Sequence, residues 1–170
     1  TSTSSGASVS ATGDVNGDGL ADLIVGASEA NGGSGRSYVV FGKTTGTAMD
    51  LTAVANGQGG FVINGFGTKN YSSKSVSAAG DVNGDGFSDI IVGAPFNDAG
   101  GTDAGRAYIY FGSYVIDYNA DVILTGTAGS KAGYSVASAG DVNRDGYADV
   151  IIGAIGYNSN NGRALIYYGG

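Results

Sequence analysis

Three nearly identical nine-residue segments constrain the fold of this chain more than any other feature of its sequence. They read DVNGDGLAD at 14–22, DVNGDGFSD at 81–89 and DVNRDGYAD at 141–149. Each has Asp or Asn at positions 1, 3, 5 and 9 and Gly at position 6, which is the ligand spacing of a Ca²⁺-binding loop. The segments begin 67 and 60 residues apart, so we expect three copies of one structural unit.

The three segments predict three Ca²⁺ sites built from oxygen ligands. Hard carboxylate, amide and carbonyl oxygens suit Ca²⁺ better than zinc or copper, and the chain has no His or Cys. We expect the side chains at positions 1, 3, 5 and 9 and the backbone carbonyl at position 7 to bind the ion. The predicted ligands are Asp14, Asn16, Asp18, Leu20 and Asp22; Asp81, Asn83, Asp85, Phe87 and Asp89; and Asp141, Asn143, Asp145, Tyr147 and Asp149. The glycine at position 6 is expected to adopt a positive φ.

Two other interpretations of these loops deserve comparison. An EF-hand is excluded because its position 12, which needs a bidentate Glu, holds Val25, Val92 or Ile152 here. An ordinary turn rich in Asn, Asp and Gly would explain the Asn-Gly-Asp-Gly part. It does not explain the Asp at position 9 in all three copies. The third loop carries Arg144 at position 4, where the other two have Gly, and we expect this cation to weaken the third site.

Short apolar runs around each loop predict β-strands. These runs are β-branched and aromatic and are bounded by Gly, Asn and Asp, and no segment keeps a helical apolar spacing over three turns. The runs that follow the loops are apolar on both faces, as in a sheet packed on both sides. The predicted strands lie at 7–13, 22–27, 35–42 and 60–65; at 74–80, 89–94, 105–112 and 121–126; and at 134–140, 149–154 and 162–169.

Composition narrows the possible functions. Hydrophobic residues make up 42% of the 170 residues and charged residues 14%, which is too apolar for a disordered chain. The net charge is −7, and nine of the 15 acidic residues lie in the three loops. Three bound Ca²⁺ ions would therefore bring the charge to −1. An acidic chain of this kind lacks the basic surface that nucleic-acid binding needs, and no apolar run reaches the roughly 18 residues of a membrane span.

The order of loop and strand motifs resembles a known repeat. The pattern G-D-V-N-x-D-G-x-x-D, followed by I-V-G-A and then by G-R-A-Y-x-x-F-G, is similar to the FG-GAP repeat of integrin α-subunit β-propellers. The resemblance implies an all-β fold of integrin-like β-propeller blades, with Ca²⁺ between the first and second strands of each blade. The expected blades are about 4–66, 67–127 and 128–170, the last without its outer strand.

Three blades are fewer than a propeller needs, because such rings close with about 4–8 blades. We therefore expect an incomplete ring. The chain is either part of a longer chain or a self-assembling homo-oligomer, for example a dimer with six blades.

The function implied by the resemblance is non-catalytic recognition or adhesion by a calcium-stabilised extracellular or cell-surface module, with a protein or glycan as its ligand. A carbohydrate-binding lectin and a purely structural, self-assembling segment are the alternatives. An enzyme is disfavoured because the usual nucleophile–base pairs need His or Cys. Loops at the end opposite the calcium loops suit ligand binding. The candidate ligand-binding residues there are Asn31, Asn97, Asp98, Tyr157 and Asn158.

Overall fold

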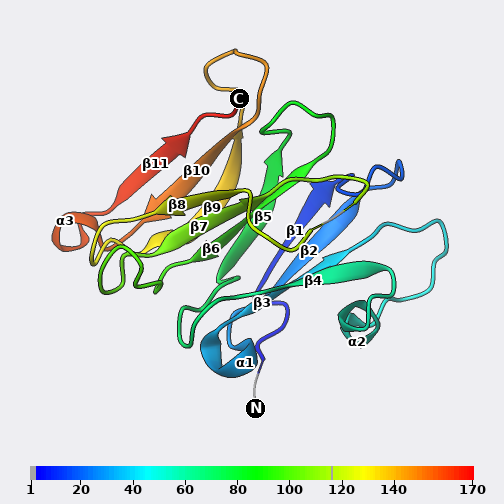
Figure 1. Ribbon diagram of the computed structural model, residues 1–170, viewed down its shortest axis with the longest axis horizontal. Coiled ribbons are helices and arrows are strands. Elements are labelled where there is room, and N and C mark those ends of the chain that lie inside the picture. Colours follow the sequence, from blue (N-terminus) through cyan, green and yellow to red (C-terminus); the bar gives the residue numbers. More distant parts are fainter. Residues whose placement is uncertain (1–2, 116) are drawn as a thin grey trace.

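The computed structural model consists of three antiparallel β-sheets that follow one another along the chain (Figure 1). It describes residues 3–115 and 117–170. The first sheet contains β1 (Ser8–Gly13), β2 (Asp22–Ala27), β3 (Arg36–Val40) and β4 (Gly60–Asn64). The second contains β5 (Ser75–Gly80), β6 (Asp89–Ala94), β7 (Arg106–Tyr110) and β8 (Val122–Thr125). The third contains β9 (Ala132–Gly140), β10 (Asp149–Ala154) and β11 (Arg163–Tyr167).

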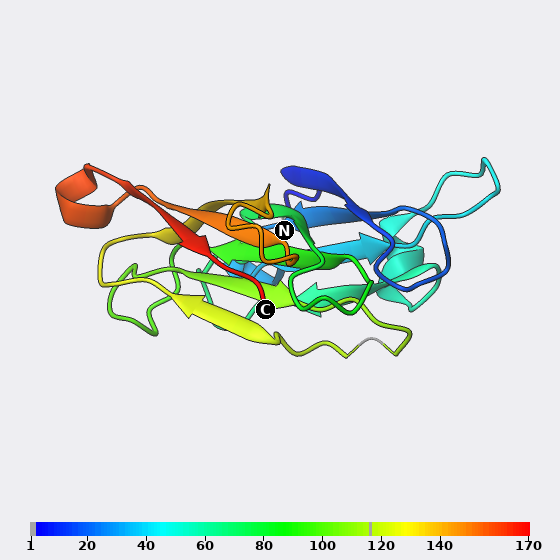
Figure 2. The same cartoon turned by 90° about the horizontal axis from the view of Figure 1, so that it is seen from above.

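The three sheets stand in an open row, and the ring is not closed (Figures 1 and 2). Strands lie in chain order within each sheet, so the first strand of every sheet is its innermost. Strand β1 contacts β5, and β5 contacts β9. These innermost strands are rich in Ser, Ala and Gly, and their small side chains allow the sheets to approach one another. The predicted all-β fold of propeller-like blades is confirmed.

The middle sheet is packed on both faces. Ile90 and Ile91 are neighbours in β6 and point to opposite faces, and the exposed fraction of each is 0%. Ile90 belongs to a core shared with the first sheet, which includes Ile24 and Val39. Ile91 belongs to a second core, shared with the third sheet. Burial of each such side chain contributes about 1.5–3 kcal/mol to folding. Strand β6 is apolar on both faces because one face packs on the first sheet and the other on the third.

A short helix covers part of the outer face of the first sheet. Helix α2 (Leu51–Ala55) begins at the N-cap Asp50, whose carboxylate accepts a hydrogen bond from the Thr52 N–H at 2.8 Å. Its Val54 is 1% exposed and packs with Tyr38 and Val40, each 8% exposed. The sequence did not predict this helix. At five residues it is too short to show a periodic pattern, and packing on the sheet stabilises it.

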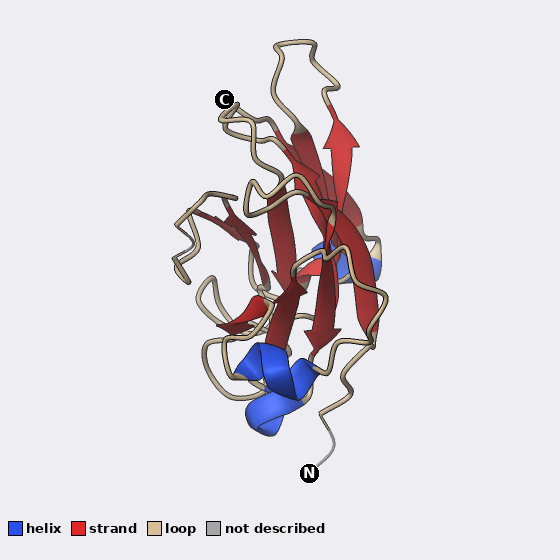
Figure 3. Cartoon of the chain, turned by 90° about the vertical axis from the view of Figure 1, so that its right-hand side faces the viewer, coloured by secondary structure: helices blue, strands red, loops and turns tan. Residues whose placement is uncertain are grey.

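The remaining outer surfaces of the row are more open. On the first sheet Val9 is 66% and Leu23 50% exposed, and on the third sheet Ile166 is 48% exposed. Two further helices, α1 (Ala30–Gly33) and α3 (Tyr157–Asn160), are single turns in strand connections, and strands and loops dominate the molecule (Figure 3). None of the helices in the described part of the chain has the length and apolarity needed to cross a bilayer.

Candidate functional site

The three repeated loops lie at the same end of the sheets, each between the first and second strands of its sheet (Figure 1). Alternating antiparallel strands place every such connection at one end and the connections after the second strands at the other. The glycines at position 6 have φ values of +84°, +90° and +97° at Gly19, Gly86 and Gly146. The predicted left-handed turn is therefore confirmed in all three loops.

The Asp at position 1 organises each loop around its carboxylate. Oδ1 of Asp14 accepts hydrogen bonds from the N–H groups of Gly17 (2.7 Å) and Asp18 (3.1 Å), and its Oδ2 accepts one from Gly19 (2.8 Å). Asp81 and Asp141 accept the corresponding three bonds in the second and third loops. The backbone thus curls around one carboxylate, which fixes the loop shape.

The side chains at positions 3 and 5 form an exposed pair next to that carboxylate. Asn16 donates from Nδ2 to Oδ2 of Asp18 at 3.0 Å, and its Oδ1 accepts from the Asp18 N–H at 3.0 Å. Oδ1 of Asp18 accepts from the N–H of Leu20 at 2.9 Å. The same bonds recur in the other two loops. Each loop therefore presents carboxylate and amide oxygens close together in sequence and space.

The Asp at position 9 is buried and connects the loop to the third strand of its sheet. Asp89 is 0% exposed, and its Oδ2 accepts from the Val82 N–H at 2.7 Å while Oδ1 accepts from the Gly112 N–H at 2.9 Å. Asp22 and Asp149 make the equivalent bonds. Gly112 is the glycine of the repeated Phe-Gly ending, so the structure gives position 9 and that ending a shared structural role that sequence reasoning missed.

Burial makes this carboxylate hard to ionise. Desolvation raises the pKa of Asp89 to about 6, the N–H groups of Gly112 and Val82 oppose the rise, and the charges of Asp85 and Asp81 add to it. Burial likewise raises the pKa of Asp22, with the same opposing and reinforcing contributions. The carboxylates at positions 1 and 5 therefore repel the buried carboxylate at position 9 in these two loops.

The donor set fits a hard divalent cation, although the acidic groups do not converge on one point. Within residues 3–115 and 117–170, no three of the His, Cys, Asp and Glu side chains form a cluster that could hold a metal ion. The carboxylate at position 9 faces backbone N–H groups. The remaining predicted ligands, the Asn amide at position 3 and the backbone carbonyl at position 7, are not acidic groups. The chemistry of the donors, all of them oxygens, still matches Ca²⁺ rather than a softer metal.

Successive loops pack on one another through the side chain at position 7 and the glycine at position 4, to which the ligand pattern gives no side-chain role. The ring of Phe87, at position 7 of the second loop, lies over Gly17, at position 4 of the first. The third and second loops repeat this relation. The signal was present in the sequence as a glycine at position 4 and an aromatic residue at position 7 of the following loop. In the third loop, position 4 is Arg144, which is exposed and has a φ of +63°.

Comparison with known proteins agrees with this architecture. The model of the FG-GAP repeat matches residues 5–40, 75–110 and 132–167, each match covering three strands and one loop. The chain belongs to the FG-GAP repeat family.

Integrin α subunits resemble these FG-GAP repeats over most of the chain. The chain is 34% identical to integrin alpha-V of Gallus gallus over 88% of its length and 32% identical to integrin alpha-5 of Xenopus laevis over 95%. It is 32% identical to integrin alpha pat-2 of Caenorhabditis elegans over 92%. The matched part spans only 15%, 16% and 13% of these relatives, so it corresponds to a small part of an integrin α chain.

The opposite end of the FG-GAP sheets carries the predicted ligand-binding residues, in three separate connections. Asn31 and Asn158 are exposed and left-handed, with φ values of +54° and +49°. Asp98 is exposed, and its Oδ1 accepts from the Asp103 N–H at 2.8 Å. Asn97 is only 6% exposed and donates to the Tyr108 hydroxyl at 3.3 Å. Tyr157 packs against the core between the second and third sheets. Asn31, Asp98 and Asn158 are thus the exposed members of the set.

Two arginines at the same position of successive FG-GAP units form hydrogen bonds to the outermost strands of their sheets. Arg36 donates from Nε to Oδ1 of Asn64 at 3.0 Å, and Arg106 donates from Nε to Oγ1 of Thr125 at 3.0 Å. Both acceptors lie in the fourth strand of the same sheet. These contacts give the two arginines a structural role, because each joins two neighbouring strands.

Proposed function

We propose that the chain is a calcium-stabilised, non-catalytic recognition module of an extracellular or cell-surface adhesion protein. One observation carries this proposal: three FG-GAP loops present the same oxygen donors, in the same hydrogen-bonded arrangement, at one end of the sheets. The similarity to integrin α subunits supports an adhesive role. The module would lend a rigid scaffold to ligand-binding connections at its other end.

The residues that would hold each ion are the oxygen donors already described. In the first loop these are Asp14, Asn16, Asp18, Asp22 and the carbonyl of Leu20, with their counterparts in the other two loops. A bound divalent cation would supply two positive charges where three carboxylates repel one another. Binding to the folded state alone would stabilise it by about 1.4 kcal/mol for each tenfold excess of free ion over the Kd.

Thermal unfolding with excess Ca²⁺ and with excess EDTA tests the calcium part of the proposal. We expect a lower Tm in EDTA, because the loop carboxylates then repel one another without compensation. A variant with Asp18→Asn, Asp85→Asn and Asp145→Asn should lose most of the Ca²⁺-dependent gain in Tm. The control Asp98→Asn changes an exposed carboxylate outside the loops and should keep that gain. Equal melting temperatures of the parent protein in Ca²⁺ and EDTA would overturn the calcium proposal.

The recognition part places the ligand at the end opposite the calcium loops. Asn31, Asp98 and Asn158 are exposed there, on connections that differ in sequence between repeats, the second being longer than the other two. Binding of immobilised extracellular-matrix proteins, measured with the triple variant Asn31→Gly, Asp98→Asn and Asn158→Gly, tests this placement. Glycine keeps the left-handed backbone of the two asparagines without strain, and an amide oxygen at position 98 can still accept from the Asp103 N–H. We expect the parent protein to bind and the variant to lose binding while keeping its Tm. Binding that the variant retains in full would contradict the placement.

Self-association is a second candidate function because the third sheet exposes apolar residues such as Ile166 and Tyr168. Two copies would supply six sheets. Such a ring needs the outer face of the first sheet as a partner surface, and α2 covers the β3–β4 part of that face. Sedimentation equilibrium in Ca²⁺, with and without EDTA, measures whether the chain is a monomer or a dimer. A monomeric mass would exclude the self-associating function, and a dimeric mass would support it.

A further inference from the structure

A hollow lined by four aromatic rings lies between the first loop, β4 and the connection from β7 to β8. Its volume is about 370 Å³, and Phe41, Phe61, Tyr114 and Tyr118 line it together with Asn16, Asp18 and Gly60. A second hollow of about 500 Å³ shares Gly60, Phe61 and Tyr118 with it and continues along β4. Both volumes lie in the range of small-molecule sites. The first hollow includes two proposed calcium ligands but extends beyond them, and the second includes none. Neither is lined by the candidate ligand-binding residues at the opposite end of the sheets.

Contacts hold the aromatic rings in place around this hollow. Phe61 is 7% exposed, and the centroids of Phe41 and Tyr118 each lie 5.9 Å from its ring. Tyr114 meets Phe87 edge to face, with centroids 4.7 Å apart. The connection itself is pinned to the first loop by the Ser113 N–H, which donates to the Val15 carbonyl at 3.0 Å. The site is therefore organised before any ligand enters.

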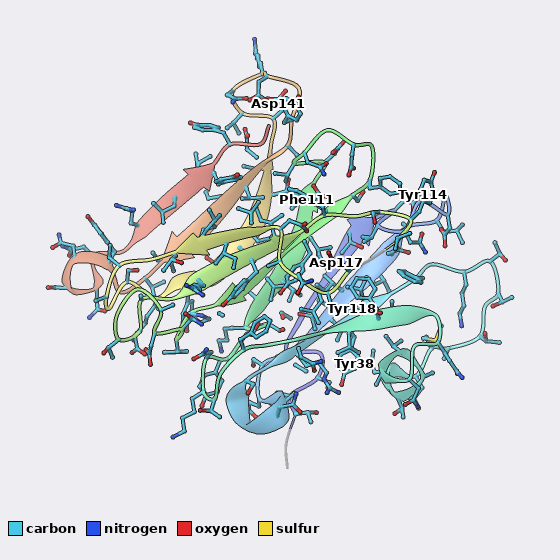
Figure 4. All side chains as sticks on the ribbon, in the orientation of Figure 1. Tyr38, Phe111, Tyr114, Asp117, Tyr118 and Asp141 are labelled. Carbon is cyan, nitrogen blue, oxygen red and sulfur yellow. The ribbon has the colours of Figure 1, made fainter. Side chains whose placement is uncertain are left out.

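Packing alone does not account for the two tyrosines. Tyr114 is 79% exposed and Tyr118 is 60% exposed. Figure 4 labels both side chains, which belong to the connection between β7 and β8. Rings that served only to attach the connection would cover more of their surface, because exposed aromatic area is unfavourable. Grouped exposed aromatic side chains on a rigid surface are typical of binding sites.

The charge around the hollow favours a cation. Aromatic faces attract positive charge, and Asp18 contributes a carboxylate to the lining. With one Ca²⁺ in the first loop, its three Asp side chains would still leave a local charge of −1. Elsewhere the chain places its own cations over aromatic rings, such as Arg163 over Tyr157 at 4.5 Å and Lys131 over Phe96 at 5.5 Å. Among the described residues, no Lys or Arg takes that position over the four rings of the hollow.

We propose that this hollow binds an organic cation of the ammonium type, held against the exposed rings of Tyr118 and Tyr114 with Phe61 beneath them and the acidic first loop as its counter-charge. A trimethylammonium head group and the side chain of a lysine share this chemistry. The site is separate from the proposed recognition surface at the opposite end, so either can be wrong without the other.

Titration of the Ca²⁺-loaded protein with choline, followed by ¹H–¹⁵N NMR spectra, tests the proposal. We expect saturable shifts for the amides of Gly60, Phe61, Tyr114 and Tyr118. The neutral isostere 3,3-dimethylbutan-1-ol has the same shape without the charge and should bind more weakly. N-acetyl-lysine methylamide is titrated in parallel, and the tighter of the two cations identifies the source of the ammonium group.

Variants separate the aromatic face from simple packing. Tyr118→Leu keeps an apolar side chain next to Phe61 but removes the aromatic face, and it should weaken choline binding by about three- to tenfold. Tyr134→Leu alters an exposed tyrosine in β9 and should leave binding unchanged. Equal affinity for choline and its neutral isostere would overturn the assignment of a cation. Absence of shifts with choline and with the lysine derivative would overturn the site itself.

Discussion

The ring of Tyr147 lies directly over Gly84, so closely that a methyl group added to that glycine would be 2.5 Å from Cε1 of the ring. Tyr147 is at position 7 of the third loop and Gly84 is at position 4 of the second. Phe87 and Gly17 make the same contact one sheet earlier, where the corresponding distance is 2.5 Å. The two contacts join the three repeated loops into one continuous row, so the loops are coupled to the packing of the sheets.

We predict that Gly84→Ala destabilises the protein more than Gly86→Ala. Both glycines have positive φ, +75° and +90°, so both substitutions introduce about 1–2 kcal/mol of backbone strain. Only Gly84 has an atom in the way, because nothing lies within 4 Å of a methyl group at Gly86. Urea unfolding in EDTA, which removes any effect on Ca²⁺ binding, measures the difference. Equal losses for the two variants would show that the aromatic contact contributes nothing.

Arg144→Gly is expected to stabilise the apo protein by about 1 kcal/mol, because a residue other than glycine pays this order of strain in the left-handed region. Arg144 has a φ of +63° and is exposed, so its removal leaves no cavity. The free energy of unfolding in EDTA measures the gain. Asn143→Gly, at the neighbouring position, removes the Asn143 bonds to Asp145 and should be destabilising. A loss of stability in Arg144→Gly would mean that the arginine makes a stabilising contact.

The strands were predictable because their chemistry is local. Runs such as DIIVGA in β6 combine β-branched residues with bounding glycines, and the structure places strands at all the predicted positions. The left-handed turn at Gly86 could also be predicted, because the loop pattern requires it at that position. The order of the sheets in an open row followed from counting the repeats.

Contacts between distant segments could not be read from local patterns. Phe61 and Tyr118 are far apart in the sequence, and no periodicity connects them, yet their rings are 5.9 Å apart. Helix α2 is stabilised by Val54 packing on the first sheet rather than by its own propensity. The buried role of Asp89 also escaped prediction, because ligand spacing describes which oxygens are present and not which N–H groups they face.

Asp89→Ala should destabilise the protein by about 2–3 kcal/mol even without Ca²⁺, since it leaves the buried N–H groups of Val82 and Gly112 without an acceptor. Asp85→Ala should cost less than about 1 kcal/mol under the same conditions, because Asp85 is exposed and its partners can bind water. Guanidinium unfolding of both variants in EDTA provides the comparison. In Ca²⁺, both should lose part of the ion's stabilisation if these residues act as ligands. Equal costs in EDTA would contradict the separate structural role of position 9.

Helix α2 is expected to shield an apolar surface, and Val54→Asp tests this function. Val54 is 1% exposed and covers Tyr38 and Val40 on the outer face of the first sheet. A buried charge at this position should detach the helix, which extends the exposed apolar surface that already includes Val9 and Leu23. We expect increased binding of a hydrophobic dye and a concentration-dependent rise in mass by light scattering. Ala55→Asp, on the exposed side of the same helix, should change neither. A monomeric Val54→Asp protein with parental dye binding would show that α2 is not needed to cover this face.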